Sequence, residues 1–383
     1  MFRRRSLRYV LVAGLALAAC LGALRFKAES HVAADSLPAQ IPDEAFWRMI
    51  SEFSERDGYF RSDNFLSNEN SFQYVIPRLT KSVSPGGVYL GVGPEQNFTY
   101  LVALQPKLAF IIDIRRQNML EHLLYKALIE LSANRADFLS RLFSRKTPSE
   151  LGSGFSVEAL FEAYKSAPPS RELFQQNLRA VQDQLIMRHR FGLTRDDLTS
   201  IEYVYNAFYN GGPDLNYSFT GGGQGGWSWF PTYAQLMTET DGRGEHRSYL
   251  ATEENFRILK RLERNNAIVP IVGDFSGPKA LRSVGRYLKE HGATATAFYT
   301  SNVEQYLFQQ DEDWKKFYSN LAAIPVDGSS TFIRSVSNRG FQYRIFNNQG
   351  RRSMPRLCEI ADLLEAFDGG RILTYSDVIA MSN

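Results

Sequence analysis

Cysteine and histidine are scarce in this chain of 383 residues, which has two cysteines and five scattered histidines. No CxxC, HExxH or similar ligand cluster is present, so the sequence predicts no protein-bound metal. If Cys20 is lipidated or removed, Cys358 is left without a partner and no internal disulfide can form. We interpret Cys358 as a buried structural cysteine in a helical segment, residues 354–361.

Strong charge is also missing. The formal net charge is only +3 and is dispersed, so the composition gives no indication of nucleic-acid binding. Hydrophobic residues make up 44% of the chain and aromatic residues 13%, which predicts a globular protein with a sizeable core. No internal repeat is evident.

The N-terminus combines a basic start with a short apolar run. Arginines crowd residues 1–8, and residues 9–19 are apolar over the length of a secretory signal, short for a bilayer span. The run ends Leu17-Ala18-Ala19-Cys20, which resembles the lipobox of bacterial lipoproteins, where Cys20 becomes the lipidated first residue. A plain signal peptide or an uncleaved anchor extending to Leu24 is the alternative.

These features predict three parts of the chain. Residues 1–24 are a lipoprotein signal, signal peptide or membrane anchor, residues 25–42 a tether, and residues 43–383 an α/β domain. The prediction places the protein in the bacterial cell envelope, held to the membrane by its N-terminus, with the domain outside the cytoplasm.

A glycine-rich turn between two apolar segments is the most informative motif. Residues 87–97 read Gly-Val-Tyr-Leu-Gly-Val-Gly-Pro-Glu-Gln-Asn, and residues 108–113 read Leu-Ala-Phe-Ile-Ile-Asp. The pattern predicts a buried strand, a turn, and a second buried strand that ends in Asp113. In α/β proteins this arrangement holds a nucleotide, because glycines allow close approach of the backbone and the acid accepts ribose hydroxyls.

The rest of the chain alternates strands and helices. Further strands are predicted near residues 267–272, 293–300 and 330–336, with helices between them, while residues 116–266 form a mostly helical insertion after the second strand. Within it, residues 200–209 fit a helix or a strand. The spacing predicts a Rossmann-like, mostly parallel sheet with both faces covered.

Polar residues at the strand ends are the candidate site, because ligands of such sheets bind beyond the carboxyl ends of the strands. The candidates are Gly91, Gly93, Asn97, Asp113, Asp274 and Asn302. Any one aspartate at a strand end is usually a helix cap or turn former, so their shared edge carries the prediction. Trp227 and Trp229, in a glycine-rich loop at residues 211–231, either stack on a ligand or pack into the core.

The glycine turn and Asp113 resemble those of class I S-adenosylmethionine-dependent methyltransferases. The chain more closely resembles an uncharacterised bacterial family with this core, through residues 91–97, 113–118, 249–256, 272–280 and 301–306. The resemblance implies a sheet of the methyltransferase type, S-adenosylmethionine as the cofactor at Gly91, Gly93 and Asp113, and Asp274 at the end of the fourth strand. Two positions depart from the methyltransferase pattern: Tyr89 replaces an acid, and Glu95 replaces the third glycine and puts a carboxyl near the ligand.

Two functions stay open. The first is methyl transfer, in which Asp274 orients a substrate or accepts a proton while Asn302, Trp227 and Trp229 frame the acceptor; its difficulty is the supply of a cytoplasmic cofactor to an exported domain. The second is a non-enzymatic module that uses the same fold to bind a small ligand or a protein. A dinucleotide-dependent dehydrogenase fits less well, because the GxGxxG spacing fails at its last glycine.

Overall fold

A six-stranded sheet forms the centre of the fold in the computed structural model, which describes residues 36–148, 154–217, 230–337 and 353–383. The strand order is β3-β2-β1-β4-β5-β6, in which β1 to β5 are parallel and β6 is antiparallel to β5. The strands are β1 (Val88–Gly91), β2 (Leu108–Asp113), β3 (Ile268–Val272), β4 (Ala295–Ser301), β5 (Thr331–Ser337) and β6 (Ser353–Glu359). The prediction of a mostly parallel α/β sheet is therefore confirmed.

Helices precede and connect the strands. Before β1 lie α2 (Asp43–Phe53), the 3-10 helix η1 (Phe72–Val75) and α3 (Ile76–Ser82), and α4 (Gln96–Leu104) joins β1 to β2. Between β2 and β3 come α5 (Arg116–Leu131), α6 (Arg135–Phe143), α7 (Val157–Ser166), α8 (Arg171–Asp183), the π-helix η2 (Gln184–Arg188), α9 (Arg195–Gly211), η3 (Gly212–Asp214), α10 (Tyr233–Thr238) and α11 (Glu253–Arg264). After β3 come α12 (Ala280–Glu290), α13 (Val303–Leu307), α14 (Asp313–Leu321), α15 (Ile360–Asp368) and α16 (Tyr375–Ala380).

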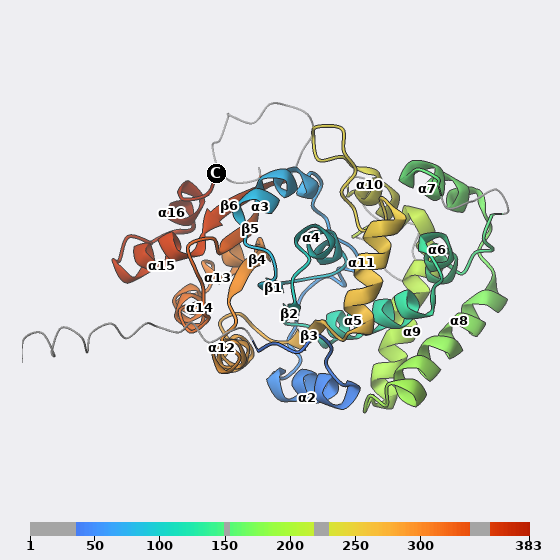
Figure 1. Cartoon of the computed structure of the whole chain (residues 1–383), viewed down its shortest axis with the longest axis horizontal. Helices are drawn as coiled ribbons and strands as arrows, with labels where there is room; N and C mark the ends of the chain where they lie inside the picture. The colour runs from blue at the N-terminus through green and yellow to red at the C-terminus, as the bar shows by residue number, and fades with distance from the viewer. Residues whose placement is uncertain (1–35, 149–153, 218–229, 338–352) are drawn as a thin grey trace, which may run out of the picture. The chain divides into compact units, whose positions relative to one another are not determined.

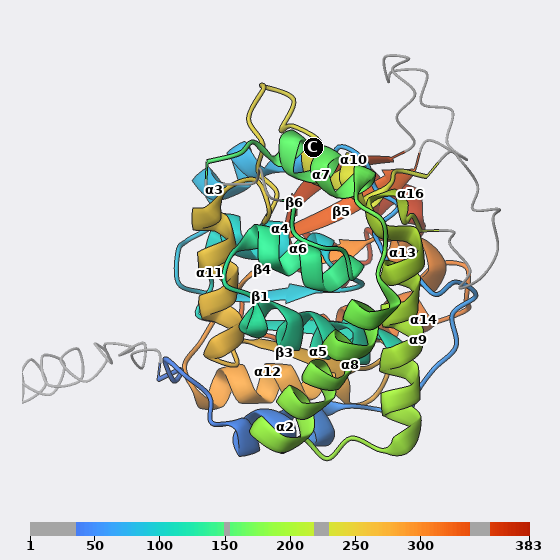
Figure 2. The ribbon, with the colours of Figure 1, turned by 90° about the vertical axis from the view of Figure 1, so that its right-hand side faces the viewer.

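The helices cover both faces of the sheet. Figure 1 shows α4, α5 and α11 on one face and α12 and α14 on the other, with α6 to α9 outside α5. Figure 2 shows the long helix α9 running alongside this outer group, where it packs against α5. Residues 200–209, which fit either a helix or a strand by sequence, belong to α9. The described helices between β2 and β3 lie in the range predicted for the helical insertion.

Burial and capping explain why these segments form these elements. Every residue of β1, β2 and β3 is buried, as expected for strands of a parallel sheet with both faces covered. Helix α11 starts at a threonine cap: the Thr252 hydroxyl accepts a hydrogen bond of 3.1 Å from the backbone N–H of Asn255, and Glu253 and Glu254 occupy the first turn.

Two sequence interpretations are wrong. Asp274 follows β3, the third strand, which pairs with β2 at the edge of the sheet, and not a fourth strand. Cys358 lies in strand β6, paired with Phe332 of β5, and not in a helix. The helical spacing of this region comes from α15, which begins at Ile360 directly after the strand, while pairing with β6 satisfies the outer backbone groups of β5.

The N-terminal predictions fall mainly on residues 1–35, so Cys20 and the signal or anchor segment lie outside the described residues. Within the described ranges, no helix combines the length and apolar character needed to cross a membrane. The end of the predicted tether packs on the domain: Ile41 is buried, and its backbone N–H donates to the Asn265 carbonyl at 3.0 Å.

Candidate functional site

A cavity of about 230 Å³ lies at the carboxyl ends of β1 to β4. The predicted residues Gly93, Asp113, Asp274 and Asn302 all line it, one from the end of each strand. Chain order reverses between β1 and β4, which are neighbours in the sheet, and such a reversal is where open α/β sheets bind ligands. Tertiary structure thus brings together four candidates that are up to about two hundred residues apart in sequence.

The glycine turn after β1 is held by Asn97. The Asn97 amide Nδ2 donates to the carbonyls of Val92 (2.9 Å), Pro94 (2.8 Å) and Gly93 (3.2 Å), and Oδ1 accepts from the Tyr89 hydroxyl at 2.9 Å. A Cβ at Gly91 would collide with this Oδ1. Gly91 and Asn97 are not among the described residues that line the cavity. Gly91 and Asn97 therefore shape the turn without lining the cavity.

Gly93 is the residue of the turn that lines the cavity. Its φ of +78° is one that residues with a Cβ rarely adopt, and a Cβ built there meets nothing within 4 Å. The open space in front of Gly93 allows a ligand to approach the backbone closely.

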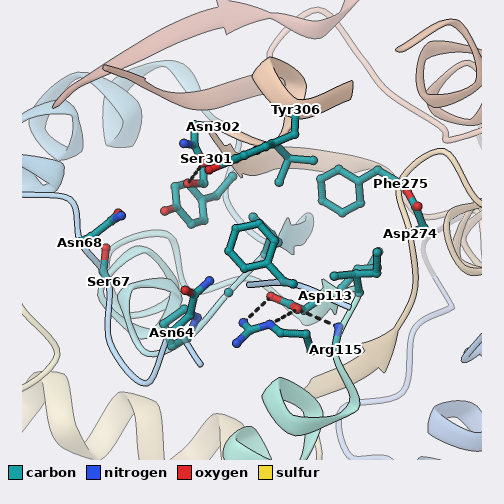
Figure 3. A pocket seen from close by; sticks show the side chains of 18 of the residues that line it. Asn64, Ser67, Asn68, Asp113, Arg115, Asp274, Phe275, Ser301, Asn302 and Tyr306 are labelled. Atoms are coloured by element: carbon teal, nitrogen blue, oxygen red, sulfur yellow. Dashed lines mark hydrogen bonds and ion pairs between the residues drawn. The ribbon is translucent and has the colours of Figure 1, made fainter. Parts of the chain in front are cut away.

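Asp113 is paired with Arg115. Asp113 Oδ1 accepts from the Arg115 backbone N–H (2.9 Å) and Nε (3.0 Å), and Oδ2 accepts from Nη2 (3.1 Å), as Figure 3 shows. Both side chains are only 7% exposed. Burial alone would lower the pKa of Arg115, but the carboxylate of Asp113 outweighs burial and raises it. Three of about four acceptor positions on Asp113 are thus occupied.

Asp274 lines the cavity and also shapes its own turn. Asp274 Oδ1 accepts from the Ser276 backbone N–H at 2.8 Å and from the Ser276 hydroxyl at 2.9 Å. The next residue, Phe275, stacks on Phe317 at 5.4 Å between ring centroids. The turn-forming role and the cavity-lining role of Asp274 therefore coexist.

The end of β4 forms the opposite side of the cavity. Figure 3 shows Ser301, Asn302 and Tyr306 grouped away from the Asp113–Arg115 pair. Ser301 has a left-handed φ of +52° at a register shift in the β4–β5 pairing. Backbone strain of this kind in a non-glycine residue persists only where surrounding contacts enforce it, and it gathers at functional sites.

Irregular residues 54–69, which we call the covering segment, supply the remaining wall. The sequence reasoning missed its cavity-lining residues, which are Tyr59, Phe60, Asn64, Leu66, Ser67, Asn68 and Glu69. The one usable signal was the polar run Ser67-Asn68-Glu69-Asn70 amid apolar residues, which helix or strand periodicity does not explain.

Glu69 is the buried carboxyl of the covering segment, 5% exposed. Its Oε1 accepts from the Ser301 hydroxyl, and its Oε2 accepts from the Gln96 amide at 3.1 Å. Burial raises the pKa of Glu69 above its usual value, although hydrogen bonding from Ser301 and Gln96, and more weakly from Tyr299 and Ser335, lowers it in part.

Aromatic side chains surround these acids. Phe60 and Tyr306 meet edge to face at 5.6 Å, Arg115 lies 6.0 Å from the Phe60 ring centre, and Tyr217 and Tyr299 also line the cavity. The ionisable acids on the described lining are Glu69, Asp113 and Asp274, against one arginine, Arg115. Carboxylates and aromatic faces both favour a positively charged ligand.

The two departures from the glycine pattern lie outside the described cavity lining. Tyr89 and Glu95 are fully buried, and neither is among the described lining residues. Burial raises the pKa of Glu95 to about 8, so its carboxyl is mainly neutral at pH 7, and it accepts from the Ser67 backbone N–H at 3.3 Å. The sequence-based concern that Glu95 puts a negative charge beside the ligand therefore loses its basis.

His122 lies behind the turn. Its Nε2 is 2.9 Å from the carbonyl of Gly93, which can only accept, so Nε2 carries the hydrogen. Burial lowers the pKa of His122 to about 4, which keeps the ring neutral at physiological pH. The residue supports the position of Gly93.

Two further predictions have no structural outcome. Trp227 and Trp229 fall in residues 218–229, outside the described residues. As for metals, the described ranges contain no group of three or more His, Cys, Asp or Glu side chains placed to hold an ion.

Together, these observations describe an α/β protein with a six-stranded, mostly parallel sheet, compatible with a Rossmann-like fold, and a cavity at the point where strand order reverses. Residues 64–354 match a family described as Domain of unknown function (DUF7790). This match spans most of the chain, so the protein belongs to that family. No curated protein matches the chain.

Proposed function

We propose that the cavity binds S-adenosylmethionine and that the protein transfers its methyl group to a small acceptor. The observation that carries the proposal is the convergence of Gly93, Asp113, Asp274 and Asn302 on one cavity where strand order reverses. A nucleoside would lie against the open backbone at Gly93, with its ribose hydroxyls toward Asp113.

The charge of the cavity supports the same ligand. S-adenosylmethionine carries a sulfonium cation, and the lining offers three carboxyl groups and several aromatic faces against one arginine. Methyl transfer needs two reactants held in line and no covalent intermediate on the protein. A site built from positioning groups, without an activated nucleophile, is therefore sufficient for the reaction.

Calorimetry on the full-length protein tests this proposal. We expect S-adenosylmethionine and adenosylhomocysteine to bind and NAD to give no heat. Asp113→Asn should weaken both adenosyl ligands by about 1–3 kcal/mol, because a charged hydrogen bond to the ribose is lost. Unchanged affinity in this variant would remove Asp113 from the site, and a folded protein that binds neither adenosyl ligand would refute the proposal.

A non-enzymatic binding module is the second candidate, and the Asp113–Arg115 pair favours it. The pair occupies most of the acceptor positions that a ribose would need. On this alternative the cavity holds a cationic ligand through Glu69, Asp274 and the aromatic rings, and Asp113 serves to hold Arg115. Asp113→Asn would then lower stability without a selective loss of adenosyl ligands.

We also propose that the protein is a lipoprotein of the cell envelope, a location that favours the second candidate because S-adenosylmethionine is a cytoplasmic cofactor. The supporting feature is the basic start and the apolar run that ends at Cys20. Metabolic labelling with a palmitate analogue should mark the wild type, and Cys20→Ser should abolish the label, with Cys358→Ser as the matched control that keeps it. Labelling of both variants would contradict the lipobox assignment.

A further inference from the structure

The β4 side of the cavity contains a carboxyl group, that of Glu69, which the proposed cofactor does not require. If the adenosyl ligand lies along Gly93, Asp113 and Asp274, the part of the cavity between β4 and the covering segment remains for the second reactant. Ser301, Asn302 and Tyr306 line it from β4 and α13, and Glu69 lines it from the covering segment.

Glu69 is the ionisable acid of this side. It is nine-tenths or more buried, and its closest donors are the Ser301 hydroxyl on Oε1 and the Gln96 amide on Oε2, with weaker hydrogen bonding from Tyr299 and Ser335. These donors fix the orientation of the carboxyl at the cavity wall. No salt bridge to Glu69 is found among the described residues, so hydrogen bonds alone hold its carboxyl group.

We propose that Glu69 faces the methyl acceptor and takes its proton, so that the acceptor is a neutral hydroxyl or amine. This inference rests on the proposed function. A carboxylate acceptor would leave Glu69 with no proton to take, whereas a neutral hydroxyl or amine must lose one.

The step balances without a further reactant. A lone pair on the acceptor oxygen or nitrogen forms the bond to the methyl carbon, and the carbon–sulfur bond breaks with its electron pair remaining on sulfur. The proton of the acceptor goes to the Glu69 carboxylate. The products are the methylated acceptor, adenosylhomocysteine and a protonated Glu69, which returns its proton to water.

The raised pKa of Glu69 suits a general base. A general base works best when its pKa lies near the working pH, and burial moves the pKa of Glu69 upward from its usual value. Hydrogen bonds from the Ser301 hydroxyl and the Gln96 amide oppose that shift, because they stabilise the ionised carboxylate that acts as the base.

A pair of adenosyl ligands tests the position of Glu69. Sinefungin carries an amino group where S-adenosylmethionine carries its methyl group, and adenosylhomocysteine has nothing there. If Glu69 faces the transferred methyl, full-length wild-type protein should bind sinefungin at least about tenfold more tightly than adenosylhomocysteine in calorimetry. Glu69→Gln should reduce this preference to less than about twofold while the affinity for adenosylhomocysteine stays within about twofold.

Glu121→Gln is the matched control. Glu121 is also a fully buried carboxyl, but it is not among the described lining residues, and neither of its oxygens has a hydrogen-bond partner in the described structure. This variant should keep the tenfold preference. Thermal unfolding of each variant establishes that it folds.

The outcomes separate the two proposals. Equal binding of both ligands by the wild type, or a preference that survives in Glu69→Gln, overturns the role of Glu69 and leaves S-adenosylmethionine binding intact. Absence of binding for both ligands overturns the proposed function and the role of Glu69 with it.

Discussion

The two walls of the cavity differ in how they are built. Strand ends form the first wall, and its residues lie at or just after the ends of β1 to β4, whose positions are set by ladders of parallel pairing. The covering segment, residues 54–69, forms the second wall with neither helix nor strand. It is held by separate contacts, such as the Gly58 N–H to the Ile114 carbonyl at 2.8 Å and the Ser67 N–H to Glu95.

The two walls therefore differ in the interactions that stabilise them. The backbone of a strand end is held by many cooperative hydrogen bonds, so the loss of one side-chain contact there leaves its position in the sheet unchanged. The covering segment is tied to the rest of the domain by separate polar contacts, among them those made by Arg115, by Glu95 and by its own Glu55, whose carboxylate accepts from the backbone N–H groups of Asp274, Lys279 and Ala280. Loss of one such group leaves a buried charge or donor without a partner, which is costly.

The largest effect is expected at Arg115. Its guanidinium pairs with Asp113 and donates through Nη1 to the carbonyls of Ser62 and Asp63 in the covering segment. Arg115→Met should lower the free energy of unfolding by about 3–5 kcal/mol, because it leaves the buried Asp113 carboxylate unpaired. Urea unfolding measures this loss, and hydrogen exchange should show the covering segment opening.

Arg116 supplies the matched control. It makes the same two-point pair with Asp197, at 2.6 and 2.9 Å, but its side chain is 38% exposed. Asp197 is buried, but it keeps hydrogen bonds from the Thr194 backbone N–H and hydroxyl, both at 2.9 Å, so Arg116→Met should cost less than Arg115→Met and leave the covering segment protected. Equal losses for the two variants would contradict the idea that Arg115 joins the two walls.

A pH-dependent effect of intermediate size is expected at Glu95. Its pKa is raised from 4.5 to about 8 in the folded protein, so folding favours the protonated form. The stability linked to Glu95 is therefore full below pH 4.5 and is lost as pH rises toward 8. Glu95→Gln removes this loss. The free energy of unfolding of the variant, minus that of the wild type, should therefore increase by about 2–4 kcal/mol from pH 5 to pH 8.

Urea unfolding of both proteins across this pH range is the measurement. Other titrating groups are shared by wild type and variant, so they cancel in the difference. A difference in stability that stays constant with pH would show that Glu95 is charged in the folded protein and would restore its negative charge to the neighbourhood of the ligand.

The smallest effects are expected within the glycine turn, where two neighbouring glycines should respond differently. Gly91→Ala places a Cβ against Asn97 and should cost about 1–3 kcal/mol of stability by overpacking. Gly93→Ala should cost about 1 kcal/mol for its positive φ and should weaken adenosyl ligands in calorimetry, since the new Cβ enters open space at the cavity. Equal ligand affinity in the two variants would remove Gly93 from the site.

Sequence reasoning succeeded where local pattern and global topology agree. The buried strands follow from periodicity, and the alignment of Gly93, Asp113, Asp274 and Asn302 at one edge follows from the rule that parallel strands end together. It failed at the strand of Cys358, because pairing across the sheet depends on a distant partner, β5, and not on the local sequence.

The amino-acid sequence by itself determined the fold class and the first wall of the cavity, because the spacing of apolar residues fixes which segments become buried strands. Only the tertiary structure decided the second wall, the pairing of Asp113 with Arg115 and the burial of Glu95 and Glu69. These depend on contacts between residues such as Glu69 and Ser301, more than two hundred positions apart. The charge state of a carboxyl is set by the surroundings that folding brings to it, which no local pattern records.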